Sequence, residues 1–455
     1  MLSKLPLILA LFMLVGCLPS TPREMEKTEP FKSTYTLTSH APYVISNINV
    51  YDGAGNFMEN TSVLVVANKI QAVGDAIDDP ALAEAEVIDG KGKWLTPGLI
   101  DNHSHLGVYP SPSIDSTSDG NELTSPDTAN VWAEHAVWPQ DPGFNLARAG
   151  GVTSLQILPG SGNLFGGRGV TLKNVSAQSM MGMKYPGAPH ALKMACGENP
   201  KRVYGRKGQL PSTRMGNMSL YRKSWIEAAD YMDKWDAWLA GDSDDKPMRD
   251  LRLETLSEVL RGNIRIHNHC YRADEMLQMI DLSKEFGYEI ASFHHAVEAY
   301  KIPKQLAAEN ICSSMWSDWW GFKLEAFDGI KENIAIVDNA GACAVVHSDS
   351  AVGIQHLNQD AAKAMASGNK AGLNISPATA IQWITLNPAK SLAIDHLTGS
   401  IEVGKAADLV IWNGDPLSVY SKAEQVFIDG NKVYDLNDSA YQAQSDYELG
   451  LGAGE

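Results

Sequence analysis

The sequence of 455 residues has few cysteines, an excess of acidic over basic residues and few long apolar segments. Its five cysteines include no Cys-x-x-Cys pair. This scatter predicts neither a zinc knuckle nor a disulfide framework. We therefore expect four of them to be small buried residues. They are Cys196, Cys270, Cys312 and Cys343.

The charge balance excludes one class of partner. Asp and Glu number 54 against 37 Lys and Arg, which gives a formal net charge of −17. Nucleic acid binding calls for a basic face, so we expect no nucleic acid partner. The Gly-x-x-x-x-Gly-Lys-Ser/Thr pattern of phosphate-binding loops is absent as well. A small-molecule substrate fits this balance, and a homo-oligomer is compatible with it.

The first residues predict export. Lys4 precedes an apolar run over residues 5–15, which is too short to span a bilayer and has the length of a signal-peptide core. The run ends in Leu14-Val15-Gly16-Cys17, which resembles a bacterial lipoprotein signal with a lipidated Cys17. Leu18 stands where an Asp would retain such a protein in the inner membrane. We expect a lipid as the sole membrane attachment, at the periplasmic face of the outer membrane of a Gram-negative cell envelope.

Composition divides the chain into five parts. Residues 1–17 are the expected signal with its lipid-carrying cysteine, and residues 18–41 are polar and Pro-punctuated, which predicts a flexible tether. Short alternating strands in residues 42–95 and 399–440 predict one small β-sandwich built from both ends of the chain. Residues 96–398 form the inserted main domain, and residues 441–455 are a C-terminal tail.

The main domain alternates short apolar strands with helical stretches, which indicates βα units and a parallel sheet. We place its strands near residues 98–103, 152–158, 169–175, 191–196, 264–269, 288–294, 310–315 and 343–348. Eight strands over about 300 residues predict an α/β fold, a closed (β/α)8 barrel of the TIM type. The helix after the third strand is hard to identify.

The end of the first barrel strand carries two histidines, His103 and His105. Residues i and i+2 of a strand share a face, so both rings can grip one metal ion. Asp101 lies two residues earlier on that face and is placed to orient them.

Other strand ends add ligand types in order. The fifth strand ends in His267 and His269, the sixth in His294 and His295, and Asp349 follows the eighth. Active sites of such barrels lie at the carboxyl ends of their strands. The fourth strand offers Lys193, a costly charge in a barrel lumen. Reaction with CO2 would convert Lys193 into a carbamate anion able to bridge two metals.

This ordered set resembles the metal-dependent amidohydrolase superfamily and, within it, the imidazolonepropionase-related branch. The resemblance covers nearly all of the chain after the signal and is carried by residues 97–105, 149–153, 197–202, 212–216, 269–274, 387–390 and 399–409. It implies that His103, His105 and Asp349 hold the more buried metal. It further implies that His269 and His295 hold a second metal and that carboxylated Lys193 bridges the two.

Three assignments have alternatives. We prefer His269 to His267 because it lies nearer the strand end, and His295 to His294 because the family has a His directly before Ala-Val-Glu. Glu198, on the loop after the fourth strand, is the alternative bridging ligand to Lys193. Five other histidines are expected to be structural or solvated: His135, His190, His347, His356 and His396.

The predicted chemistry is hydrolysis. Two divalent ions, zinc by default and manganese or iron otherwise, would activate water, and Asp349 would move its proton. The expected target is a C–N bond other than an endopeptide bond, in a cyclic amide, an N-acyl amino acid or a dipeptide-like substrate. A single-metal deaminase is disfavoured because Arg272 stands where those enzymes have Glu. The alternative from another class is a non-catalytic barrel lipoprotein for binding.

Substrate contacts are expected on the loops. Arg168, in the glycine-rich stretch 159–169, is a candidate to meet a substrate carboxylate. Arg214 and Arg272 are further cationic candidates near the mouth, and a structural ion pair is the favoured alternative for each. Trp316, followed by Trp319 and Trp320, is a candidate wall of the substrate pocket.

Overall fold

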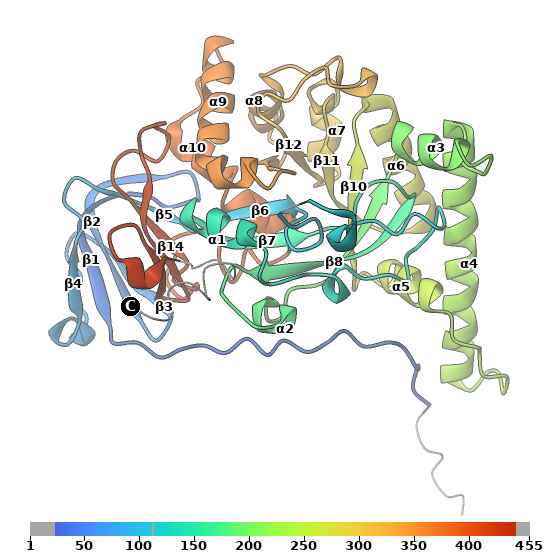
Figure 1. Cartoon of the computed structure of the whole chain (residues 1–455), viewed down its shortest axis with the longest axis horizontal. Coiled ribbons are helices and arrows are strands. Elements are labelled where there is room, and N and C mark those ends of the chain that lie inside the picture. The colour runs from blue at the N-terminus through green and yellow to red at the C-terminus, as the bar shows by residue number, and fades with distance from the viewer. Residues whose placement is uncertain (1–22, 112, 443–455) are drawn as a thin grey trace, which may run out of the picture.

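The computed structural model describes residues 23–111 and 113–442. One β-sheet domain lies beside a larger barrel whose outer edge is a long helix (Figure 1). The predicted signal at 1–17, with Cys17, lies outside the described residues, as does most of the predicted tail 441–455. A search of the described helices finds none with both the length and the apolar character of a membrane span.

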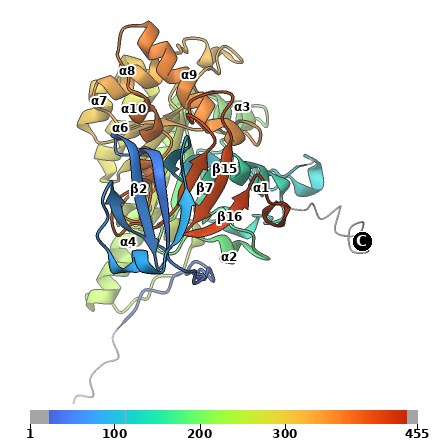
Figure 2. The same cartoon turned by 90° about the vertical axis from the view of Figure 1, so that its left-hand side faces the viewer.

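The smaller domain is built from both ends of the chain, as the sequence predicts. Its eight strands join in one continuous sheet in which β14 pairs antiparallel with β5, linking the C-terminal segment to the N-terminal one (Figure 2). Ile45, Ile48 and Leu409 meet in its core. The strands are β1 (Tyr43–Tyr51), β2 (Phe57–Val66), β3 (Lys69–Gly74), β4 (Glu86–Asp89), β5 (Trp94–Pro97), β14 (Leu409–Trp412), β15 (Ala423–Ile428) and β16 (Asn431–Asp435).

The larger domain confirms the predicted barrel class. Its eight strands follow one another in sequence order around a second sheet. They are β6 (Leu99–Ser104), β7 (Val152–Ile157), β8 (Phe165–Lys173), β9 (Ala191–Ala195), β10 (Arg265–Cys270), β11 (Ile290–His295), β12 (Cys312–Met315) and β13 (Ala344–Val346). Closure between β13 and β6 is incomplete: Val346 N donates to Trp383 O at 3.0 Å and Ile100 N to Ile384 O at 2.9 Å, so residues 383–384 fill the gap.

One strand departs from the parallel pattern. β8 runs antiparallel to both β7 and β9. Only residues 158–164 join β7 to β8. A parallel connection needs a crossover of a dozen or more residues, so this short loop can only reverse the chain. The third strand is also antiparallel to the fourth, so no crossover helix is needed after it, and only the four-residue helix α2 (Met180–Met183) lies between the two.

Eleven α-helices of very different length cover the barrel in the described residues. The longest, α4, starts where the Thr213 side chain accepts a hydrogen bond from Gly216 N and ends at Gly241 in the left-handed region. The helices are α1 (Pro142–Ala149), α2 (Met180–Met183), α3 (Glu198–Gly205), α4 (Arg214–Ala240), α5 (Leu251–Leu260), α6 (Ala273–Phe286), α7 (Pro303–Ala308), α8 (Asn333–Asn339), α9 (Leu357–Lys370), α10 (Pro377–Gln382) and α11 (Leu386–Ser391).

The cysteines correct a prediction. Cys196 is bonded to Cys270 and Cys312 to Cys343, with Cα–Cα distances of 5.2 and 4.4 Å. Strand register explains the pairing: Ala195 lies opposite His269 and Ala344 opposite Ser313, which sets each pair of cysteines on adjacent strands. Cys196, Cys270 and Cys312 are buried as expected. The expectation of no disulfide framework was wrong because sequence spacing carries no information about neighbours in a barrel.

Residues 23–42 differ from the expected flexible tether. They contain no helix or strand but form an extended strap along the lower side of the barrel, from α4 to the sheet domain (Figure 1). Arg23 Nη1 donates to Trp238 O at 2.8 Å, Thr28 N to Glu254 Oε2 at 2.8 Å and Tyr35 OH to Asp429 Oδ2 at 2.5 Å. The strap is thus hydrogen-bonded along its length.

Candidate metal centre

The two histidines of the first barrel strand meet the aspartate of the last. His105 Nε2 lies 3.1 Å and His103 Nε2 3.6 Å from Asp349 Oδ1. Asp349 N donates to His103 O at 3.1 Å, so the backbone also joins the two strand ends. His103 is buried, while the side chains of His105 and Asp349 are 20% and 21% exposed. The centre therefore opens toward solvent on the side of His105 and Asp349.

Backbone strain places two of the side chains. His295 has φ 69° and Asp349 φ 49°, both in the left-handed region that residues with a Cβ rarely adopt. At His295 this conformation ends β11 and breaks the alternation of the strand, so its ring lies beside that of His103, with centroids 4.9 Å apart. Such strain is typical of functional sites, where the surrounding structure has to maintain it.

The second predicted pair also converges. The rings of His269 and His295 have centroids 4.5 Å apart, and His295 Nδ1 lies 3.9 Å from Asp349 Oδ2. Within the described residues, the buried atoms His269 Nδ1 and His295 Nδ1 have no hydrogen-bond partner. Buried polar atoms are normally satisfied, so these two nitrogens fit a metal ion as their partner.

Lys193 points into the same cluster. It is buried on β9, and its Nζ lies 3.2 Å from His103 Nε2. Burial lowers the pKa of Lys193 to about 8. Glu198, the alternative bridge, begins α3 and lies 3.5 Å from Lys323 Nζ. The geometry therefore favours Lys193 as the group that faces the ligand cluster.

The histidines set aside in the sequence form an inner layer. His103 Nδ1 contacts His294 Nδ1 at 2.9 Å, and His294 Nε2 contacts His267 Nδ1 at 2.8 Å. This chain of three rings engages both nitrogens of His294. It leaves His103 Nε2 to face Asp349, so His294 and His267 orient the His103 ring.

His347 is the residue that the sequence reading missed. Its ring centroid is 5.1 Å from that of His103, and its Nε2 accepts a hydrogen bond from His295 N at 3.3 Å. The expectation of a structural or solvated residue is therefore incomplete, because His347 stands in the ligand cluster. A usable signal existed: His347 and Asp349 have the same i, i+2 spacing as His103 and His105.

Asp101 acts on the backbone of the site rather than on its rings. Its Oδ1 accepts from His103 N at 3.1 Å, and its carboxylate also accepts from the Ser348 hydroxyl. Burial raises the pKa of Asp101 to about 7, against the opposing effect of these hydrogen bonds. Asp101 thus joins β6 to the turn that carries Asp349.

The centre contains two groups of three possible ligand residues, and within each group the ligand atoms all lie within 4.8 Å of one another. One group is formed by His103, His295 and His347, and the other by His103, His105 and Asp349. Burial lowers the pKa of His103, His269 and His295 well below its usual value, with nearby cations adding to the effect. These imidazoles are neutral at pH 7, as metal ligands must be. The donor set therefore fits a divalent ion that accepts nitrogen and oxygen ligands.

Asp349 stays ionised in this environment. Burial alone would raise the pKa of Asp349, but the hydrogen bond from His105 and the neighbouring positive groups lower it overall. A carboxylate at the open side of the centre is able to accept a proton.

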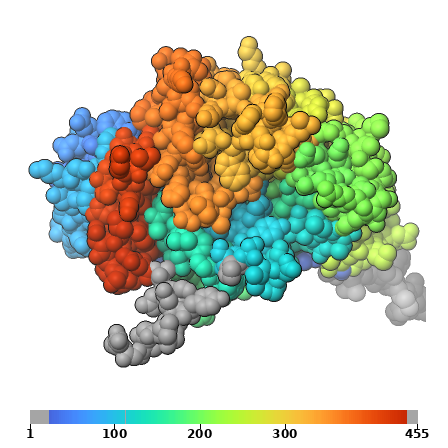
Figure 3. All heavy atoms as spheres, turned by 45° about the horizontal axis from the view of Figure 1, so that its top comes forward, coloured from blue at the N-terminus to red at the C-terminus, as the bar shows by residue number. Residues whose placement is uncertain are grey.

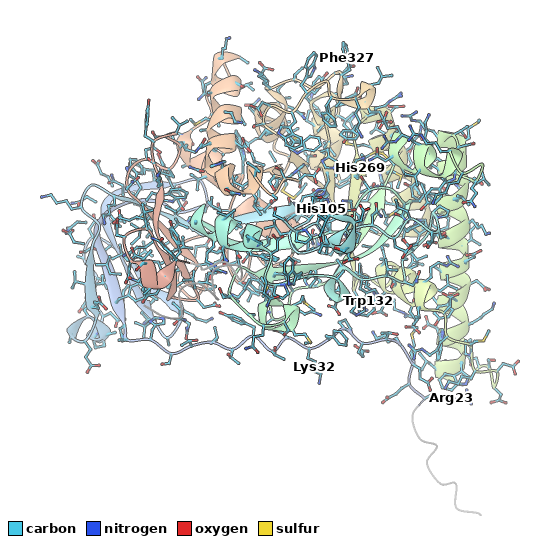
Figure 4. All side chains as sticks on the ribbon, viewed as in Figure 1. Arg23, Lys32, His105, Trp132, His269 and Phe327 are labelled. Carbon is cyan, nitrogen blue, oxygen red and sulfur yellow. A yellow bond between two sulfur atoms is a disulfide. The ribbon has the colours of Figure 1, made fainter. Side chains whose placement is uncertain are left out.

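Arg168 corrects a prediction. It lies in β8 opposite Leu192, one position after Gly167, which faces Lys193. Alternation turns its side chain out of the barrel, where Nε donates to Thr255 Oγ1 at 2.8 Å and the guanidinium covers Trp132 at 4.0 Å. Trp132 lies below His105, on the side where the strap passes Lys32 (Figure 4). Arg168 is therefore remote from the centre.

The other two arginines are held in ion pairs. Arg214 Nε lies 3.0 Å from Glu275, and Arg214 also contacts Glu325. Arg272 Nε lies 2.9 Å from Asp274 Oδ1. Both guanidinium groups are therefore held in structural ion pairs, the alternative to a substrate contact.

Trp316 stands against the centre as the sequence suggests. Its ring stacks on His295 with centroids 4.2 Å apart, and its Nε1 donates to Ser348 O at 3.1 Å. Trp319 stacks on Trp316 at 5.0 Å, while Trp320 points elsewhere and donates to Phe327 O. Trp316 and Trp319 together make one wall.

A barrel that gathers histidines, a lysine and an aspartate at its strand ends has the architecture of metal-dependent hydrolases. The amidohydrolase family model matches residues 256–434. A crystal structure of an amidohydrolase from Thermotoga maritima MSB8 is 37% identical, covers 86% of this chain and 100% of its own, and superposes with a TM-score of 0.79. The chain belongs to the amidohydrolase family.

Two curated relatives add detail. Amidohydrolase tasK of Hapsidospora irregularis is 33% identical over 403 residues, which is 82% of this chain but 40% of that protein. The chain thus spans less than half the length of that relative. The imidazolonepropionase of Idiomarina loihiensis is 47% identical over 66 residues, only 14% of this chain and 16% of its own. This second match is local.

Proposed function

We propose that this chain is a metal-dependent hydrolase of small substrates, cleaving the C–N bond of a cyclic amide, an N-acyl amino acid or a dipeptide-like molecule. The observation that carries the proposal is the meeting of three strand ends. Ligand atoms of His103, His105 and Asp349 lie within 4.8 Å of one another, and His295 belongs to a second such group that also contains His103. Membership of the imidazolonepropionase-related branch is part of the proposal, supported by the local match.

The residues present would hold two ions. His103, His105 and Asp349 would hold one, His269 and His295 the other, and Lys193 as a carbamate would lie between them. The pKa of Lys193 near 8 supports this role, because a neutral amine is the form that reacts with CO2. Imidazole and carboxylate ligands favour zinc, with manganese or iron as alternatives. When bound, such ions lower the pKa of water and polarise a carbonyl group.

Asp349 is the proposed proton carrier. As water attacks, a C–O bond forms at the carbonyl carbon, the C–N bond breaks, and Asp349 transfers the proton of the water to the leaving nitrogen. Its ionised state and its place at the open side of the centre suit this task. His105 Nε2, 3.1 Å from Asp349 Oδ1, would hold the carboxylate in position.

Two other functions are less well supported. Adenine deaminases are among the relatives, one from Clostridium botulinum being 25% identical over 385 residues, but Arg272 occupies the position expected for a deaminase Glu. A barrel used only for binding does not explain why several buried histidine nitrogens at one place lack a hydrogen-bond partner in the described part of the chain. Each such nitrogen lowers the stability of the fold by about 1–3 kcal/mol.

We also propose that the protein works outside the cytosol, attached to the cell envelope by a lipid on Cys17. Two disulfides in one chain support an oxidising compartment, because cytosolic thiols are kept reduced. The predicted signal sequence supports the same location.

The test combines metal analysis with a substrate panel. Purified protein should contain about two divalent ions per chain and hydrolyse at least one member of a panel of dipeptides, N-acyl amino acids, lactams and hydantoins. One ion per chain would favour the deaminase-like alternative, and none would favour binding only. The variant His103→Ala should lose both metal and activity, whereas His356→Ala, at an exposed position, should lose neither.

A further inference from the structure

An aromatic surface leads outward from the metal centre. It comprises Tyr271, Trp316, Trp319 and Phe322, and we call it the aromatic ramp. Trp316 stacks on His295, Trp319 stacks on Trp316 at 5.0 Å, and Phe322 meets Trp316 edge-on at 5.6 Å. Exposure rises along it from 9% at Trp316 to 45% at Trp319 and 54% at Phe322. Clustered apolar exposure of this kind marks a binding surface.

Three members of the ramp, Trp316, Trp319 and Phe322, belong to the loop after β12, on the side of the molecule where the strands end, and Tyr271 directly follows β10. In the space-filling view, the yellow-to-orange part of the chain occupies the upper centre of this face, between the sheet domain and the green region of α4 (Figure 3). Phe327, farther along the same loop, lies above His269 and His105 (Figure 4). A ligand at the centre therefore has this loop as its outer neighbour.

One cation is set into the ramp. Lys323 Nζ lies 4.0 Å from the centre of the Tyr271 ring and donates to Asn199 Oδ1 at 3.2 Å. Asn199 Nδ2 in turn lies 3.3 Å from His269 Nε2. The ammonium group is thus two contacts from a proposed metal ligand, and its side chain is only 18% exposed.

Lys323 is less firmly paired than the other cations of this rim. Its nearest carboxylate oxygen, on Glu198, is 3.5 Å away. By contrast, Arg272 lies 2.9 Å from Asp274, and Lys301 lies 2.8 Å from Asp328 and 3.0 Å from Glu298. An ammonium group so placed can take up an anionic group of a substrate, and a charge-assisted hydrogen bond away from bulk water is strong.

We propose that the substrate carries a free carboxylate and an aromatic side chain on the nitrogen side of its scissile bond, as an N-acyl aromatic amino acid or a dipeptide ending in one. The carboxylate bonds to Lys323 Nζ, and the aromatic ring packs on Trp319 and Phe322. This inference rests on the proposed function. Hydrolysis adds the water oxygen to the acyl carbon, breaks the C–N bond and protonates the nitrogen, so the products are a carboxylic acid and an aromatic amino acid.

The first experiment compares N-acetyl-L-phenylalanine with its carboxamide and with N-acetyl-L-alanine on the metal-loaded full chain. We expect kcat/KM for the first to exceed that for each of the others by at least about 10-fold, because one lacks the charge and the other the ring. Equal rates for the acid and the amide would overturn the role of Lys323.

The second experiment uses matched variants. Lys323→Gln should lower kcat/KM about 10- to 100-fold for the acid and leave the carboxamide nearly unchanged. Trp319→Ala should raise KM for the phenylalanine substrate and spare the alanine one. Lys301→Gln and Trp320→Ala, on the same rim but outside the ramp, are the controls. A loss that is equal for all substrates would indicate a structural role and overturn the proposal.

A binding measurement separates this inference from the proposed function. Tryptophan fluorescence of the metal-free protein, titrated with N-acetyl-L-phenylalanine, should report saturable binding that Lys323→Gln weakens. Hydrolysis of lactams or hydantoins without hydrolysis of these acids would overturn the inference and leave the proposed function standing. Hydrolysis of no panel member would overturn both, whereas retained binding of the carboxamide alone would contradict the role of Lys323.

Discussion

At the scale of single residues, the centre is governed by which side chains face the barrel lumen and in what charge state. Neutral histidines, an ionised aspartate and a lysine with a lowered pKa share one buried volume. His294 and His295 show how fine the assignment is. Neighbours on a regular strand point to opposite faces, yet the positive φ of His295 brings both rings to the lumen side. Neither composition nor spacing predicts that torsion.

Asp349→Asn tests the proton carrier. The amide is nearly isosteric but cannot accept the proton, so we expect kcat to fall by a factor of about 10² or more. The measurement is kcat on the best panel substrate together with metal content and far-UV circular dichroism, both of which should be largely kept. Asp233→Asn, on the exposed face of α4, is the control. Activity above a tenth of the wild-type value would contradict the role.

At the scale of elements, a disulfide joins two neighbouring strands through cysteines that are far apart in the sequence. Cys312 and Cys343 are 31 residues apart and join the start of β12 to the residue before β13. The barrel register makes them neighbours, and a sequence without a Cys-x-x-Cys motif gives no sign of it. The predicted strand positions, in contrast, agree with the structure to within a few residues, because apolar runs bounded by turns are local signals.

Removing the Cys312–Cys343 disulfide should reduce stability. The double variant Cys312→Ser, Cys343→Ser frees the loop between them in the unfolded chain, so we expect a loss of about 2–4 kcal/mol in the free energy of unfolding. Urea titration without reductant measures this loss. Thiol titration of the unfolded wild type should find the cysteines of both disulfides, Cys196–Cys270 and Cys312–Cys343, oxidised. Unchanged stability, or free thiols at these positions, would contradict the disulfide.

The strap provides a prediction about pH. Glu134 is buried beneath it, 3.1 Å from His190 Nε2, and accepts from Phe31 N at 3.2 Å. Although burial opposes ionisation, hydrogen bonds from His190 and Lys184 lower the pKa of Glu134 to about 2 from an ordinary 4.5. A lowered folded-state pKa stabilises the fold above pH 4.5, and this contribution disappears as the pH falls toward 2.

Glu134→Gln should therefore lower the free energy of unfolding by at most about 3 kcal/mol at pH 6 and by much less at pH 2.5. Urea unfolding at both values measures the difference, and proteolysis within residues 23–42 should become faster at pH 6. Glu26→Gln, which removes an exposed strap carboxylate, is the control. A cost that is the same at both pH values would show that ionisation of Glu134 is not the cause.

At the scale of the whole molecule, the proposed ligands come from strand ends spread around the barrel, on β6, β9, β10, β11 and β13. Ions held by so many elements bind the folded chain alone, and such binding stabilises it by mass action.

Metal removal should consequently lower Tm by several degrees and abolish activity. Treatment with a chelator, followed by differential scanning calorimetry, measures the shift, and added zinc should restore both properties. His103→Ala with His105→Ala is the control, since a chain unable to hold the ions should show no shift on chelation. The same Tm for chelated and untreated wild type would argue against tightly held ions.

The sequence by itself determined the class of fold, the joining of the two chain ends and most of the residues that meet at the centre. These three features can be predicted from local apolar periodicity and from polar residues at strand ends. Only the tertiary structure decided the antiparallel course of β8, the two disulfides, the outward direction of Arg168 and the entry of His347 into the cluster. Each of these depends on strand register or on a single backbone torsion, which arises from packing between segments distant in the chain.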